Sequence, residues 1–107
     1  MKNDFTKETR LLFIDNYMDW EDGCNDIDCL HHILGRVSNS PYNVAPLSNF
    51  RTHWPEWRQS HKLSPIHSFE VQKKYLLKTK LFLEKTGYLP KDDDLVFLEK
   101  YKKYYEN

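Results

Sequence analysis

Two adjacent histidines, His31 and His32, lie in the short apolar run "DCLHHILGRV" at residues 28–37. On a β-strand, neighbouring side chains point to opposite faces, so the two imidazoles would have different surroundings. A neutral imidazole binds metal ions, and an imidazole with an ordinary pKa near 6.5 is also a general base at neutral pH. The pair could supply a metal ligand and a proton acceptor. Taken alone, such a pair is more often two ordinary polar residues on a half-buried strand.

Hydrolysis of a phosphodiester needs a metal ligand and a base side by side. A divalent cation stabilises charge on the phosphate and on the leaving oxygen, while the base takes a proton from the attacking water. His53 lies 21 residues after His32 and could return to the same cation as a second ligand. The amide of Asn43, at the end of the intervening loop, could tie that loop and fix the orientation of a ring.

The segments "HHILGR" and "YNVAPLSN", followed by His53, resemble the HNH endonucleases, the ββα-metal group. In that family a strand carries a metal ligand followed by the catalytic histidine, a loop carries an asparagine, and a helix carries the last ligand. The resemblance implies that His32 is the general base and that His31 and His53 bind the metal. It makes Asn43 the orienting residue. It covers about residues 28–61.

Two features differ from the commonest form of this pattern. Ser48 stands where a cysteine that braces the motif through structural zinc is usual. The chain has only Cys24 and Cys29, with four residues between them, so a zinc site of that kind is not expected and both thiols are expected to be reduced. His53 also follows the loop asparagine by one residue more than usual, which leaves His61 as a substitute or third metal ligand.

The charge of the chain is unevenly distributed although its net value is zero. Residues 1–30 carry three basic and eight acidic side chains, a net charge of −5, whereas residues 31–67 carry four basic and one acidic, a net charge of +3. All five histidines fall in this basic segment, and the clustering indicates a site.

Several other residues of the basic segment have two interpretations. Three arginines are candidates for phosphate contacts or plain surface charge: Arg36, Arg51 and Arg58. Trp54 and Trp57 could stack on unpaired bases, but we expect them in the core. His67 is expected to have a structural role near the start of the following helix.

The elements that must position these residues follow from capping and breaking signals. A helix is expected over residues 6–20 with Thr6 as its cap, and strands are expected within residues 26–37 and at residues 44–47. Ser48 is expected to cap a short helix that ends at Pro55, with irregular chain over residues 55–67.

The last forty residues are expected to be helical. Ser68 begins a long helix that runs to about Thr86 and is stopped by Gly87. A second helix over "DDDLVFLEKYKKYYE" carries acids in its first turn and lysines later, which suits the helix dipole.

These elements predict one α+β domain over residues 1–107. A small ββα-metal core at about residues 26–61 would be flanked by the N-terminal helix and by a C-terminal helical extension at about residues 68–106. No run reaches the roughly 18 apolar residues of a membrane span, and the first residues do not form a signal peptide. A soluble, cytoplasmic protein is therefore expected, and the resemblance suggests a phage or mobile-element origin.

The function that these features favour is metal-dependent hydrolysis of DNA. Mg²⁺ or Mn²⁺ is the expected ion, although histidine ligands would also accept Zn²⁺ or Ni²⁺. An RNA substrate stays open, as does the oligomeric state. Two other classes are alternatives: a non-catalytic, metal-stabilised module that binds nucleic acid or protein, and a small helical interaction protein. In a nuclease, His32 points away from the metal, whereas in a structural site every histidine faces it.

Overall fold

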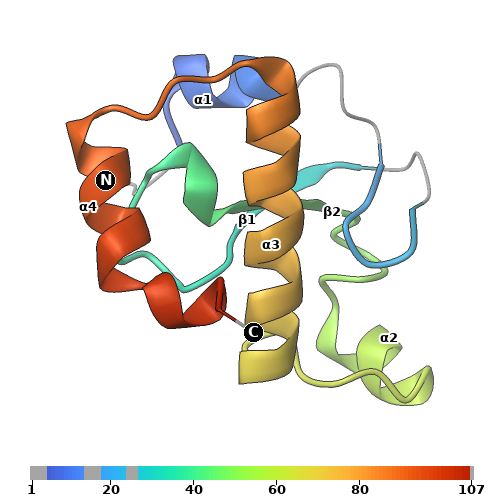
Figure 1. Cartoon of the computed structure of the whole chain (residues 1–107). Coiled ribbons are helices and arrows are strands. Elements are labelled where there is room, and N and C mark those ends of the chain that lie inside the picture. The colour runs from blue at the N-terminus through green and yellow to red at the C-terminus, as the bar shows by residue number, and fades with distance from the viewer. Residues whose placement is uncertain (1–4, 14–17, 24–26, 107) are drawn as a thin grey trace.

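The computed structural model describes residues 5–13, 18–23 and 27–106, and it is a mixed helical and β structure (Figure 1). The predicted α+β class is confirmed at this level. The elements in chain order are α1 (Lys7–Leu12), β1 (Cys29–His32), η1 (Pro41–Asn43), β2 (Val44–Leu47), α2 (Pro55–Ser60), α3 (Phe69–Thr86), α4 (Asp92–Lys100) and η2 (Lys102–Tyr104), where η marks a 3₁₀ helix.

Helix α1 is shorter than the helix predicted over residues 6–20. Thr6 caps it as expected, because its hydroxyl accepts a hydrogen bond from the backbone N–H of Thr9 at 3.1 Å. Trp20 lies outside any helix, and its indole donates to the hydroxyl of Thr79 on α3 at 2.7 Å. A contact distant in sequence therefore fixes Trp20, which local helical periodicity does not reveal.

Strands β1 and β2 form a two-stranded antiparallel sheet in which His31 pairs with Ala45 and His32 with Val44. The strand predicted at residues 44–47 is confirmed, and Pro46 is tolerated because both strands of such a sheet are edges. β1 ends at His32 because the chain turns at Gly35, whose φ is 81° and whose N–H donates to the carbonyl of His32.

The helix predicted from Ser48 to Pro55 is wrong. This segment is a series of turns, and α2 begins at Pro55, in the stretch predicted to be irregular. Ser48 is occupied by other bonds: its N–H donates to the buried carboxylate of Asp19 at 2.7 Å, and its carbonyl accepts from the N–H of His53 at 3.0 Å. Proline suits the first position of a helix, where no N–H is needed.

The two C-terminal helices begin as predicted. The hydroxyl of Ser68 accepts from the N–H of Val71, and Gly87 ends α3 with a left-handed φ of 83°. Helix α4 ends at Lys100, earlier than predicted, and η2 continues the chain. In Figure 1 the sheet lies behind α3, with α4 on one side and α2 on the other.

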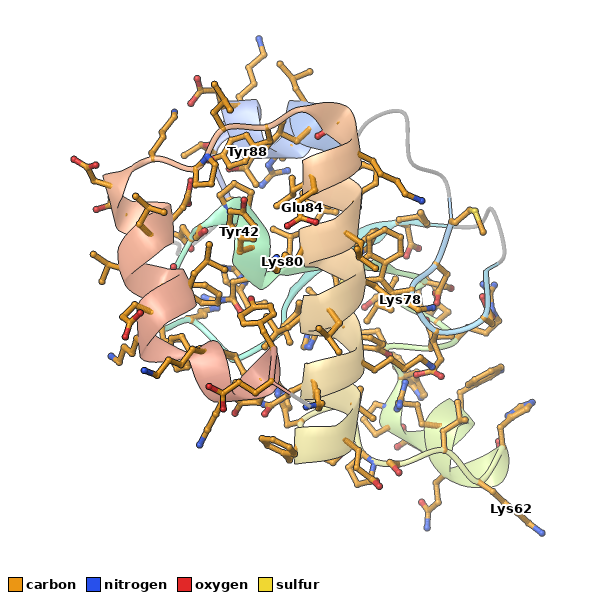
Figure 2. All side chains as sticks on the ribbon, viewed as in Figure 1. Tyr42, Lys62, Lys78, Lys80, Glu84 and Tyr88 are labelled. Carbon is orange, nitrogen blue, oxygen red and sulfur yellow. The ribbon has the colours of Figure 1, made fainter. Side chains whose placement is uncertain are left out.

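One hydrophobic core joins the sheet to the helices. Its buried members include Val44 and Leu47 of β2 and Tyr75 of α3. Tyr42 and Tyr88 lie together between α3 and α4, with ring centroids 5.9 Å apart (Figure 2). The sheet whose strand β1 carries the paired histidines is thus held by the C-terminal helices. No helix in the described ranges is long and apolar enough to cross a membrane.

Candidate functional site

His31 lies inside the molecule, on the face of β1 that meets the segment after β2. Its side chain is 6% exposed, and its ring centroid lies 5.0 Å from that of His53 and 5.3 Å from that of His67. Its Nε2 atom is buried and has no hydrogen-bond partner among the described residues. An unsatisfied buried polar atom costs about 1–3 kcal/mol, so this nitrogen needs an explanation.

The surroundings of His31 keep its imidazole neutral. Burial, together with the neighbouring His53 and His67, lowers its pKa to about 3. Burial also lowers the pKa of His53 below its usual 6.5, together with the charges of His67 and Arg58. Near neutral pH both rings are therefore deprotonated, which is the form whose lone pair binds a metal ion.

A buried carboxylate holds the turn that presents His53. Asp19 is 1% exposed, and its Oδ2 accepts from the N–H of Ser48 at 2.7 Å and from the hydroxyl of Thr52. The Nδ1 atom of His53 lies 3.2 Å from the amide oxygen of Asn49. Asp19 is not predicted by the sequence, because nothing in its local sequence distinguishes it from the other acids of the N-terminal segment.

The third imidazole beside His31 is His67, whereas His61 was the predicted candidate. His61 is exposed, and its ring stacks on that of Trp57 with centroids 3.8 Å apart. Within the described ranges, no three histidine, cysteine, aspartate or glutamate side chains are grouped so as to hold a metal ion. His61 therefore does not complete a three-ligand site with His31 and His53. The position of His67 depends on how α3 packs. The clustering of histidines in the sequence is the only signal that indicated a site including His67.

His32 has a different set of neighbours, as strand alternation predicts. Its ring stacks on Phe5 with centroids 3.9 Å apart, and its Nε2 lies 2.9 Å from the amide oxygen of Asn39. A carbonyl oxygen only accepts, so the tautomer that fits this contact has its proton on Nε2 and leaves Nδ1 to accept one. His32 also lines a cavity of about 360 Å³ together with Arg10 and Arg36.

Asn43 ties the loop between the strands. It is fully buried; its Oδ1 accepts from the N–H of Leu34 at 2.8 Å, and its Nδ2 donates to the carbonyls of Gly35 and Ser38 at 3.0 and 2.9 Å. Its polar atoms are satisfied, and the loop that carries Asn39 to His32 is fixed. The loop-tying contact expected of Asn43 is present, and its part in catalysis stays a prediction.

The phosphate contact predicted for Arg58 is wrong. Arg58 is 2% exposed, with a guanidinium nitrogen 3.2 Å from a carboxylate oxygen of Glu21 and another 2.8 Å from the carbonyl of Thr52. Phosphate cannot reach this enclosed group. Arg51 is partly exposed and pairs with Asp22 at 3.0 Å.

Arg36 is exposed on the His32 side of the strand, and its phosphate contact stays a prediction. The core position expected for Trp54 is wrong, because this side chain is 43% exposed. Trp57 is half-buried. Both tryptophans lie at or in α2, which is a single short helix with little area to cover them.

Comparison with protein-family models found no match for the chain. Searches against curated proteins and against solved structures also found no match.

Proposed function

We propose that this protein is a metal-dependent DNA endonuclease of the HNH type, with β1, β2 and α2 as its ββα-metal unit. The observation that carries the proposal is the buried, unpartnered Nε2 of His31 beside His53. Its sequence neighbour His32 faces a separate cavity. This arrangement provides a ligand pair and a base from one short strand.

The residues present fit a bound divalent ion. His31 and His53 would hold it, because both rings are neutral and a metal ion would satisfy the otherwise orphaned Nε2 of His31. When bound, the ion supplies electrostatic stabilisation of the scissile phosphate and the leaving oxygen. Two imidazole ligands leave coordination positions for water and phosphate oxygens. Mg²⁺ and Mn²⁺ are the proposed ions, with Zn²⁺ and Ni²⁺ as further candidates for imidazole ligands.

The base in this proposal is Nδ1 of His32. The hydrogen bond to Asn39 holds the proton on Nε2, and the stack on Phe5 fixes the plane of the ring, so Nδ1 can take a proton from water in the cavity. Arg36 would hold a phosphate at the mouth of this cavity, and Asn43 would keep the loop in place.

The test is plasmid nicking with Mg²⁺, Mn²⁺ or EDTA. His32→Ala is expected to lower the cleavage rate by about 100-fold or more, because general-base catalysis typically contributes 10²–10⁴. His61→Ala, which changes an exposed histidine outside the cluster, is the matched control and should retain full activity. Cleavage in EDTA, or full activity of His32→Ala, would contradict the proposal.

The second candidate is a non-catalytic module in which the metal is structural. The ring of His67, with its centroid 5.3 Å from that of His31, favours it, because a His67 ring that turned toward the ion would leave fewer coordination positions for phosphate oxygens than two ligands do. In that case His67→Ala would weaken metal binding as strongly as His53→Ala and no variant would affect cleavage, because wild type would not cleave. In the nuclease, His67→Ala weakens metal binding less than His53→Ala.

A further inference from the structure

Two large aromatic side chains project from the turn that carries His53. Phe50 is 72% exposed and Trp54 is 43% exposed, and their ring centroids lie 6.0 Å apart with the planes tilted by 31°. This separation exceeds the roughly 3.5–4.0 Å of face-to-face atomic contact, so neither ring covers the other fully. They flank the histidine whose ring contacts His31.

The backbone of this turn is fixed although its aromatic rings are exposed. The N–H of Trp54 donates to the carbonyl of Arg51 at 3.0 Å, and the carbonyl of Trp54 accepts from the N–H of Arg58 at 3.0 Å. Thr52, between the two aromatic residues, is fully buried and bonded to Asp19. The two rings are therefore exposed to solvent on a turn whose backbone is fixed by hydrogen bonds. Figure 2 shows Lys62 pointing outward just beyond α2.

We propose that Phe50 and Trp54 form a platform on which unpaired bases of single-stranded DNA stack. This inference rests on the proposed function, because a phosphodiester held beside His31 and His53 would bring its own bases to the adjoining turn. Aromatic rings stack on any base, and a duplex hides the faces of its bases, so the platform selects for unpaired strands.

The charge of the chain supports stacking as the source of affinity. The 16 basic and 16 acidic residues cancel, and in the basic segment Arg51 and Arg58 are already paired with carboxylates. Attraction to phosphates is therefore limited. Stacking contributes about 1–3 kcal/mol per base, so the two rings would supply affinity that this neutral chain does not obtain from phosphate contacts.

The platform is tested by fluorescence anisotropy with a labelled single-stranded oligodeoxynucleotide of about 12 nucleotides, in EDTA so that cleavage does not interfere. Trp54→Ala and Phe50→Ala are each expected to raise Kd by about 5- to 150-fold, the equivalent of one lost stacking contact. Trp54→Phe should keep most of the affinity. Leu89→Ala is the matched control, because Leu89 is an 81% exposed apolar side chain between α3 and α4.

Several results would overturn the inference. One is equal affinity of the wild type, Trp54→Ala and Leu89→Ala for the oligonucleotide. Others are tighter binding of the matching duplex, or no binding together with self-association that Trp54→Ala abolishes in sedimentation, which would make the surface an interface between copies.

The two proposals fail separately. If nicking requires His32 but the affinity for the oligonucleotide does not change in Trp54→Ala, the stacking platform is wrong and the proposed endonuclease activity is retained. If affinity requires Trp54 but nothing is cleaved, the platform stands as a binding surface and the endonuclease is wrong.

Discussion

The two sides of β1 hold their imidazoles in opposite ways. On one side, the buried His31 has two histidine neighbours, His53 and His67, and a depressed pKa. On the other side, His32 is half-buried at the edge of a cavity. Its ring stacks on Phe5 and contacts the amide oxygen of Asn39. A metal ligand needs a free lone pair away from competing protons, whereas a base must exchange a proton with water. One strand separates these two conditions, because successive side chains point to opposite faces.

The two sides of β1 also differ in the segments that build them. The His31 side is built from segments after β2 and rests on the buried Arg58–Glu21 pair and on Asp19. The His32 side is built from Phe5, before α1, and from the loop that carries Asn39. On the closed side, which the buried Arg58–Glu21 pair supports, substitution of that pair should act through stability. On the open side, around His32, substitution should act through activity.

The largest expected effect comes from removing the buried charge on the closed side. Arg58→Ala should lower the free energy of unfolding by about 3 kcal/mol, because it leaves the Glu21 carboxylate buried with Lys74 and Tyr75 as remaining partners. Arg36→Ala, on the open side, should change it by less than about 0.5 kcal/mol. Urea denaturation of both variants measures the difference, and equal effects would remove the contrast between the sides.

Metal affinity should depend on the histidines of the closed side and not on His32. His31→Ala and His53→Ala are each expected to weaken Co²⁺ or Ni²⁺ binding by at least about 100-fold, about 2.7 kcal/mol, because each removes a ligand. His32→Ala should leave the affinity within a few-fold of the wild type. Isothermal titration calorimetry on folded variants measures these affinities. A loss of affinity in His32→Ala as large as in His31→Ala would mean that both rings face the ion.

The smallest effect concerns Asn39, which we regard as a positioning residue for His32. Asn39→Ala should change stability by less than about 0.5 kcal/mol, since this side chain is exposed, and should lower kcat more than it changes KM. ¹⁵N NMR of the His32 ring should show the proton on Nε2 in the wild type and a mixture of tautomers in the variant. A wild-type ring protonated on Nδ1 would show that the asparagine presents its NH₂ group.

Local signals predicted the elements whose ends are fixed by their own residues. Ser68 and Gly87 bound α3 because capping and left-handed conformation are properties of single residues. The helix predicted after Ser48 failed because Asp19, distant in sequence, takes the N–H of Ser48 and holds the segment as turns. Arg58 was assigned to the surface because the sequence does not show that the carboxylate of Glu21 pairs with it in the interior.

For the site, the sequence by itself determined that His31 and His32 occupy opposite faces, since alternation is a property of any strand, and that Asn43 lies where it can tie the loop. The tertiary structure alone decided that His67 rather than His61 lies against His31, that Trp54 is exposed, and which ring is buried. These outcomes depend on how α2 and α3 pack beside β1, and packing brings together residues whose separation along the chain carries no periodic signal.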